Sequence, residues 1–180
     1  MIAIALACDP KLIIADEPTT ALDVTIQAQI LELMKELTRR LDVALIIITH
    51  NLGVVARYAN RVNVMYAGRI VESGPAAAIY HNPRHPYTMA LLRSVPRLDR
   101  PRQARLDPVE GQPPDLTRLD QGCSFRPRCR FAIDVCARKR PALEAAGQGL
   151  HSAACFRSTE VAAETATAKT RLLAGGVANS

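Results

Sequence analysis

The stretch that decides the fold is residues 12–17 (LIIADE), a short apolar run that ends in two adjacent carboxylates. Its length and flanks are typical of a buried parallel strand. A second apolar run, residues 43–49 (VALIIIT), leads into His50. Between the two runs, apolar residues at spacings of three and four predict an amphipathic helix over 26–41, with Asp23 or Thr25 as its cap. Strand, helix and strand in this order predict an α/β fold with a right-handed crossover.

The polar residues that follow these strands suggest phosphate chemistry. Ligands bind at the carboxyl ends of the strands in open α/β sheets. Phosphoryl transfer there needs a carboxylate for Mg²⁺ and a second group for the attacking water, so Asp16 is interpreted as the metal acid and Glu17 as the water-orienting group. His50 would reach the same rim and donate to a terminal phosphate. Taken alone, the Asp-Glu pair is more simply explained as the solvated start of a loop, and His50 as a residue that caps the following turn. The occurrence of both at one edge of the sheet favours a functional site.

Residues 15–23 (ADEPTTALD) resemble the Walker B segment and D-loop of ABC ATPases, and residues 48–51 (ITHN) resemble their switch histidine. The resemblance implies a P-loop NTPase parallel sheet that uses ATP and Mg²⁺. It also implies Asp16 as the magnesium-site acid, Glu17 as the catalytic glutamate and His50 as the γ-phosphate sensor. Asp23 would be the D-loop residue at the interface of an ATPase dimer.

Several parts of that family's site have no counterpart in the sequence. The phosphate loop G-x-x-x-x-G-K-[ST], the glutamine switch and the serine-glycine-glycine signature are absent. In the family the signature directly precedes a helix like residues 1–8, so Met1 is interpreted as an internal methionine taken as a start. We expect a C-terminal part of the ATPase that alone neither hydrolyses ATP nor folds stably, with the apolar faces of 12–15 and 43–48 exposed. A non-functional remnant of a split gene is a further reading.

The chain after the second strand predicts smaller elements and a change of domain. Residues 61–66 and 69–73 predict a hairpin that turns at Gly68, followed by short helices at 76–80 and 87–94. The expected organisation is an ATPase part at 1–81, a Pro/Arg-rich linker at 82–121, a cysteine-bearing module at 122–156 and a disordered tail at 157–180.

Residues 85–88 (HPYT), 94–96 (SVP) and 122–129 (GCSFRPRC) resemble the segment that follows the ATPase domain in oligopeptide and dipeptide importers. The resemblance implies a subunit that energises uptake of peptides, or of nickel complexes, from the cytoplasmic face of the inner membrane. Its implied partners are a second ATPase subunit, membrane permease subunits and, indirectly, an extracytoplasmic solute-binding protein. Residues 109–111 (VEG) depart from the Ile-Pro-Gly turn that is usual in the family.

Four cysteines of the 122–156 module could act together: Cys123, Cys129, Cys136 and Cys155. Four thiolates complete a zinc site or a [4Fe–4S] cluster. Paired Cys-x-x-Cys knuckles are absent, which disfavours zinc, whereas the family resemblance implies a cluster in some members. Four reduced cysteines in a small apolar knot remain an alternative, and a metal or iron–sulfur module without ATPase activity is the competing function. Cys8 is interpreted as a core residue, and His151 as a packing or surface residue rather than a further ligand.

The charge of the chain is basic, at +6, with arginine concentrated between Arg93 and Arg140. Aromatic residues make up only 4% and no recognition motif accompanies the basic stretch, so we expect no nucleic-acid partner. No run approaches the roughly 18 apolar residues that span a bilayer. The chain is therefore expected in the cytoplasm, where reducing conditions argue against disulfide bonds.

Overall fold

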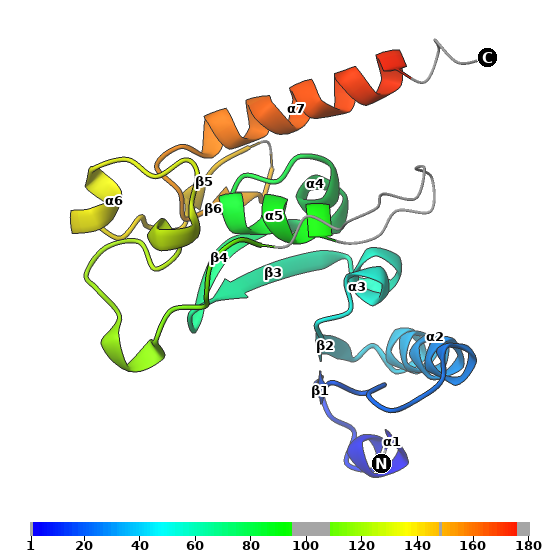
Figure 1. The fold of residues 1–180 in the computed structure, drawn as a ribbon. Helices are drawn as coiled ribbons and strands as arrows, with labels where there is room; N and C mark the ends of the chain where they lie inside the picture. Colours follow the sequence, from blue (N-terminus) through cyan, green and yellow to red (C-terminus); the bar gives the residue numbers. More distant parts are fainter. Residues whose placement is uncertain (1, 95–108, 148, 176–180) are drawn as a thin grey trace. The chain divides into compact units, whose positions relative to one another are not determined.

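The computed structural model describes residues 2–94, 109–147 and 149–175, and its elements are labelled in Figure 1. The fold is mixed α/β, with one parallel and one antiparallel sheet. Two compact units divide between Ala59 and Asn60. Within the described residues, no helix combines the length and apolar character that a membrane span requires.

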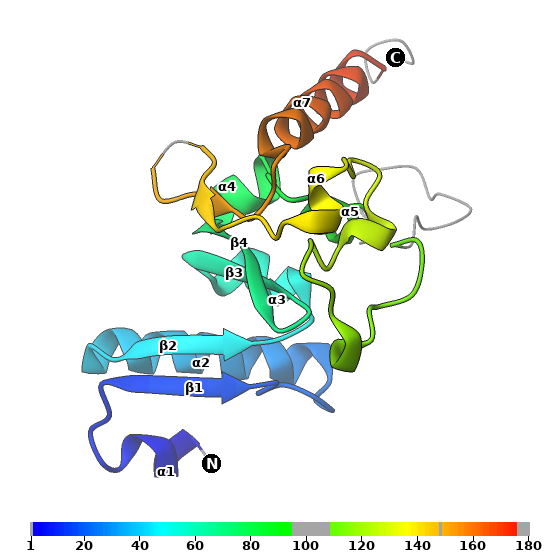
Figure 2. The same ribbon diagram turned by 90° about the vertical axis from the view of Figure 1, so that its left-hand side faces the viewer.

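The smaller unit contains the predicted strand–helix–strand motif. Its elements are α1 (Ile2–Leu6), β1 (Leu12–Asp16), α2 (Val24–Leu41), β2 (Ala44–Ile48) and α3 (Leu52–Tyr58). The strands pair in parallel, with Leu12 opposite Ala44 and Asp16 opposite Ile48. Helix α2 runs along one face of this pair (Figure 2). The predicted parallel pairing of these strands is confirmed.

Helix α2 forms where the apolar spacing predicts it. The Asp23 carboxylate caps its start, accepting from the backbone N–H groups of Thr25 at 3.0 Å and Ile26 at 2.9 Å. Leu31 and Met34 are buried on its inner face. The helix ends at Asp42 in the left-handed conformation, whose N–H donates to the Thr38 carbonyl.

Only one face of the two-stranded sheet is covered. Ile14 is 61% exposed and Ile46 is 48% exposed, on the face away from α2. The prediction of exposed apolar faces is thus confirmed, and the strands are not buried on both sides. Helix α1 is also exposed, as is Cys8, so the predictions of a buried helix and a core cysteine are wrong for the described structure. No described element packs over either of them.

The larger unit is built on the predicted hairpin. Strands β3 (Arg61–Tyr66) and β4 (Arg69–Pro75) are antiparallel. Ala67 and Gly68 both have positive φ, 48° and 73°, the backbone pattern of a type I′ turn. Two short strands from late in the chain extend the sheet in the order β3-β4-β6-β5. These are β5 (Glu144–Ala145) and β6 (Ser152–Ala153).

The larger unit also contains helices and 3₁₀ turns outside this sheet. They are α4 (Ala76–His81), α5 (Pro86–Ser94), the 3₁₀ turns η1 (Leu116–Arg118) and η2 (Arg126–Arg128), α6 (Val135–Arg138) and α7 (Ser158–Gly175). The two helices predicted at 76–80 and 87–94 are confirmed as α4 and α5. The turn at 109–111 is held by Arg128, which donates to the carbonyls of Val109 at 2.8 Å and Glu110 at 2.7 Å.

Helix α7 corrects the prediction of a disordered tail from residue 157. It lies beside α5 (Figures 1 and 2). Val161 is completely buried, and the Glu164 carboxylate accepts from Arg93 at 3.0 Å and also from Arg130. Burial and ion pairing therefore hold a segment whose Ala/Thr composition gives little periodic signal. Residues 95–108 of the expected linker and 176–180 of the expected tail lie outside the described residues.

The carboxylate of Glu72, on β4, is fully buried and joins three segments of the larger unit. One oxygen accepts from the backbone N–H of Arg84 at 2.6 Å and from Nε2 of His151 at 2.8 Å. The other accepts from the backbone N–H of His85 at 3.0 Å. The hairpin, the segment before α5 and the start of β6 therefore meet at one side chain.

We predict that Glu72→Ala destabilises the larger unit by about 3 to 5 kcal/mol, because it leaves two backbone N–H groups and a histidine buried without their acceptor. Urea unfolding followed by circular dichroism measures this difference. Glu144→Ala, which removes an exposed carboxylate from β5, is the control and should change stability by less than about 0.5 kcal/mol. Equal effects of the two substitutions would contradict the central role of Glu72.

Candidate functional site

The two parallel strands of the smaller unit end at a common rim. Asp16 lies opposite Ile48, and the backbone N–H of Glu17 continues the ladder by donating to the Ile48 carbonyl at 2.9 Å. His50 follows two residues later. The pairing register therefore brings Glu17 and His50 together, as expected from the sequence.

The Glu17 carboxylate and the His50 ring form a direct contact. Glu17 Oε1 lies 2.7 Å from His50 Nδ1 and also accepts from the His50 backbone N–H at 3.2 Å. The hydroxyl of Thr20 donates to Glu17 Oε2 at 3.2 Å. The hydrogen bond from His50 lowers the pKa of the Glu17 carboxyl, and the bond from Thr20 adds to the effect. At neutral pH the site therefore presents an ionised carboxylate beside an imidazole that is 84% exposed.

The backbone of Glu17 is in the left-handed region, with φ of 45°. A non-glycine residue adopts this conformation at a cost and needs support from its surroundings. Here the support is a hydrogen bond on each side of the residue: its N–H donates to Ile48, and its carbonyl accepts from the Thr20 N–H at 3.1 Å. Strained residues of this kind cluster at functional sites, which makes the conformation a signal that sequence reasoning missed.

The other two predicted rim residues stand apart from this contact. Asp16 ends β1 with an exposed side chain. The carboxylate of Asp23 is engaged as the cap of α2, which confirms the capping prediction. Its expected position at a dimer interface remains a prediction.

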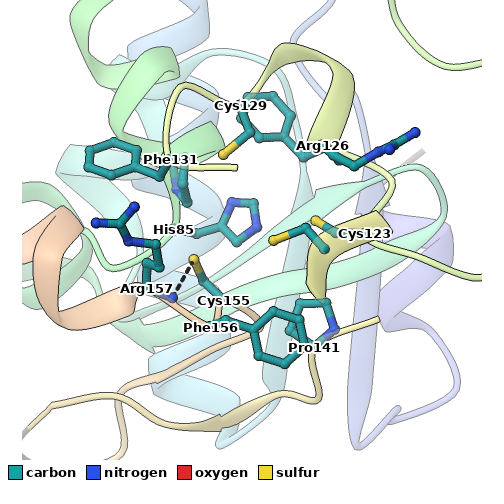
Figure 3. Close-up of a pocket in the computed structure, with 12 residues that line it drawn as sticks. His85, Cys123, Arg126, Cys129, Phe131, Pro141, Cys155, Phe156 and Arg157 are labelled. Carbon is teal, nitrogen blue, oxygen red and sulfur yellow. Dashed lines mark hydrogen bonds between the residues drawn. The ribbon is translucent and has the colours of Figure 1, made fainter. Parts of the chain in front are cut away.

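The four cysteines of the 122–156 module line one small, partly enclosed hollow (Figure 3). They come from different segments: Cys123 precedes η2, Cys129 follows it, Cys136 lies on α6 and Cys155 lies between β6 and α7. The expectation that they lie together is met by the lining of this hollow. Phe125, Phe131 and Phe156 provide apolar walls.

The backbone beside Cys123 passes unusually close to α6. A Cβ atom on Gly122 would stand 2.3 Å from the carbonyl oxygen of Cys136, so only glycine fits there. The Cys123 N–H donates to that same oxygen at 2.8 Å. This close approach holds the segments of Cys123 and Cys136 against each other.

The Cys155 sulfur accepts a hydrogen bond from the backbone N–H of Arg157 at 3.4 Å. Burial raises the pKa of the Cys123 thiol, and it raises the pKa of Cys129 and of Cys155 to about 11. These three thiols are therefore neutral at pH 7, and a bound cation would be needed to hold them as thiolates.

His85 also lines the hollow, although sequence reasoning gave it no role. Its side chain is almost fully buried, and its ring centroid lies 5.8 Å from that of Phe125. Burial lowers the pKa of His85 to about 4, so its ring is neutral at pH 7. The only sign in the sequence was its place in the 85–88 motif.

The thiols are not arranged as a formed metal centre. All five cysteines are free, and no group of three or more Cys, His, Asp or Glu side chains in the described parts of the chain has a metal-ligating arrangement. His151 lies against Glu72 inside the sheet, which fits the predicted packing role. Four thiols and a buried imidazole around one hollow nevertheless provide the donor types that zinc or an iron–sulfur cluster uses.

Comparison with known proteins gives two family matches. The family described as "Oligopeptide/dipeptide transporter, C-terminal region" matches residues 71–136. The family described as "AAA domain, putative AbiEii toxin, Type IV TA system" matches residues 1–56.

Curated relatives match most of the chain. A putative peptide import ATP-binding protein of Brucella ovis is 53% identical over 167 residues, which is 90% of this chain and 49% of the relative. The oligopeptide transport ATP-binding protein OppD of Salmonella typhimurium is 52% identical over 89% of this chain and 47% of its own length. The dipeptide transport ATP-binding protein DppD of Bacillus subtilis is 57% identical over 78% of this chain and 42% of its own length. The chain therefore spans about half the length of the relatives it matches.

We predict that His50→Ala raises the pKa of the Glu17 carboxyl toward its ordinary value, because the largest stabilisation of the ionised form is lost. Carboxyl carbon chemical shifts in an NMR titration measure this pKa. Thr20→Val should raise it less, since the hydroxyl bond is the weaker contribution. The Glu17–His50 contact stabilises the rim at pH values above the ordinary pKa of a glutamate carboxyl. This stabilisation is lost as the pH falls through the lowered pKa of Glu17. An unchanged Glu17 titration in His50→Ala would show that the contact does not form in solution.

Proposed function

The chain belongs to the ATP-binding proteins of oligopeptide and dipeptide ABC transporters, spanning about half their length, and on that premise we propose that it provides the hydrolytic rim of an importer ATPase. The reaction is ATP hydrolysis with Mg²⁺, coupled to peptide uptake. The observation that carries the proposal is the 2.7 Å contact between Glu17 and His50 where two parallel strands end.

Each rim residue has a role that its surroundings support. Glu17 is ionised and oriented by Thr20 and His50, which suits a group that accepts a hydrogen bond from the attacking water. His50 Nδ1 donates to the Glu17 carboxylate, so its Nε2 would donate to a terminal phosphate only in the doubly protonated imidazolium form. Asp16 has an exposed carboxylate for the magnesium ion and its waters.

The proposed setting is a nucleotide-sandwich dimer at the cytoplasmic face of the inner membrane. Asp23 would lie near a second ATPase subunit, and permease subunits would receive the movement, with a solute-binding protein as an indirect partner. Peptide is favoured over nickel as cargo because the relatives' names specify peptide, oligopeptide or dipeptide transport. The proposed parts remain the ATPase part at 1–81, the linker at 82–121 and the cysteine module at 122–156.

The proposal also holds that these 180 residues alone do not hydrolyse ATP. The sequence has no glycine-rich loop with a lysine to hold the β- and γ-phosphates. The uncovered face of β1 and β2 is consistent with a sheet that continues in a longer protein.

We predict that the chain gains ATPase activity when it replaces the matching half of the Bacillus subtilis dipeptide ATP-binding protein, which supplies the upstream part. In this chimera Glu17→Gln should lower kcat by about 100-fold or more, because the base or orienting group for water is lost. Phosphate release under saturating ATP and Mg²⁺ measures the rate. Glu32→Gln, on the exposed side of α2, is the matched control and should leave kcat unchanged.

Two results would count against this proposal. Hydrolysis by the 180-residue chain alone, abolished by Glu17→Gln, would show that no upstream phosphate loop is needed. Full activity of the Glu17→Gln chimera would remove Glu17 from the mechanism.

For the hollow, we propose a [4Fe–4S] cluster held by Cys123, Cys129, Cys136 and Cys155. Their shared lining and the Arg157 backbone N–H that donates to the Cys155 sulfur support a thiolate site, because such a bond stabilises charged sulfur. When bound, a cluster supplies four iron–thiolate bonds and a redox-active centre. The chain's own contribution is to bring four segments of the larger unit to one hollow that three phenylalanines also line.

Anaerobic reconstitution with ferrous iron and sulfide tests this proposal. We expect about four irons per chain and a broad visible absorbance, both lost in Cys136→Ser. Cys8→Ser, which alters the exposed cysteine of the other unit, should load as the unaltered chain does. Preferential uptake of a single zinc ion, or no uptake of iron, would contradict the cluster.

A further inference from the structure

Two of the four cysteines in the hollow lie on backbone segments that touch each other. The backbone N–H of Cys123 donates to the Cys136 carbonyl at 2.8 Å. One residue earlier, a Cβ atom on Gly122 would stand 2.7 Å from the Ala137 carbonyl oxygen, closer than a side chain tolerates. The segment that leads into η2 and the segment of α6 are therefore in direct backbone contact.

Arg140 fastens the same two segments a second time. Its Nη2 donates to the Asp120 carbonyl at 2.8 Å, and its Nε donates to the Gly122 carbonyl at 3.3 Å. Since Arg140 lies two residues beyond the end of α6, these bonds tie the chain after the helix to the chain before η2. The approach of Cys123 to Cys136 therefore does not depend on a single hydrogen bond.

This contact places the two cysteines at the separation that a disulfide requires. Residues joined by an N–H···O bond across paired strands have Cα atoms about 5.5 Å apart. A disulfide forms without backbone movement at Cα separations of roughly 4.4 to 6.8 Å, provided that the side chains point toward each other. Both side chains line the same hollow, whose volume of about 10 Å³ leaves room for roughly one water. Cys123 and Cys136 therefore face one small space.

The other two cysteines lack this backbone contact. Cys129 makes its backbone hydrogen bonds to Arg126 and Ala132, which belong to its own turn. Cys155 lies between β6 and α7, and Figure 3 shows it and Cys129 on separate segments around the hollow. Among the described residues, no backbone hydrogen bond joins either of them to another cysteine.

We propose that Cys123 and Cys136 form an intramolecular disulfide when hydrogen peroxide oxidises the metal-free chain, so that the pair is a site of reversible thiol modification. The peroxide first converts one thiol to a sulfenic acid and releases one water. The second thiol attacks this sulfur, the S–S bond forms as the S–O bond breaks, and a second water leaves. Two thiols and one peroxide thus give one disulfide and two waters.

The burial of the pair suggests the order of reaction and the kind of oxidant. Cys123 is partly exposed, whereas Cys136 is only 9% exposed, so Cys123 is expected to meet the peroxide first. Hydrogen peroxide is close to water in size and fits the hollow, which is far too small for a bulky disulfide such as oxidised glutathione. The inference does not depend on the cluster proposal, because it concerns the chain before any metal is bound.

The test counts thiols in the metal-free full chain carrying Cys8→Ser, because Cys8 is exposed and would itself react with peroxide. Four cysteines then remain of the five in the sequence. We expect excess peroxide to lower the number of free thiols from four to two and dithiothreitol to restore them. Peptide mapping by mass spectrometry without reduction should recover the bond between Cys123 and Cys136.

Oxidation of the same chain in urea shows whether the fold selects the pair. Closure of a short loop costs less entropy than closure of a long one, so bonds from Cys129 to Cys123 or to Cys136 should dominate in the unfolded chain. The Cys123–Cys136 bond closes a longer loop and should dominate only in the native chain. Adding Cys136→Ala should abolish the paired loss of thiols, whereas adding Cys155→Ala should leave it unchanged.

The outcomes separate this inference from the cluster proposal. A native chain that keeps all four thiols, or that yields the same mixture of bonds as in urea, would overturn the inference, even if the reduced chain loads iron. Recovery of the Cys123–Cys136 bond from a native chain that takes up no iron would support the inference while the cluster proposal fails.

Discussion

The larger unit depends on one buried carboxylate that no solvent can satisfy. Glu72 is completely enclosed, so it remains only because two backbone N–H groups and an imidazole donate to it. Two of these donors belong to consecutive residues, Arg84 and His85, and the same contact that satisfies Glu72 sets where the His85 ring enters the hollow. The hydrogen bonds that satisfy Glu72 therefore link the packing of the sheet to the lining of the cysteine hollow.

The sequence was informative wherever structure is local or periodic. The burial of Met34, the Asp23 cap and the turn at Gly68 each follow from interactions within a few residues, and all appear as predicted, whereas Leu31 is buried in place of the predicted Leu33, which is 44% exposed. The meeting of Glu17 and His50 was also predictable, because parallel strands must end at the same edge of their sheet. The strained φ of Glu17 was not, since nothing in its side chain announces it.

What the sequence did not predict depends on partners far along the chain. The burial of Glu72 depends on the backbone N–H groups of Arg84 and His85 and on the His151 ring, which lies 79 positions further along the chain. The α7 segment looks featureless because its order comes from Val161 in the core and from arginines on α5 and beyond η2. The prediction that Cys8 is a core residue was wrong for the opposite reason. Its apolar neighbours in the sequence suggested burial, but Cys8 is exposed.

The separation of Glu72 and His151 along the chain also affects when their contact can form during synthesis. The two residues are 79 positions apart. At roughly 5 to 20 residues per second, a ribosome needs on the order of 4 to 16 s to add the second after the first. Until His151 has been added, the Glu72 carboxylate lacks one of its three donors. The larger unit therefore closes late in synthesis, and its sheet is completed by β6, the last strand of the described residues.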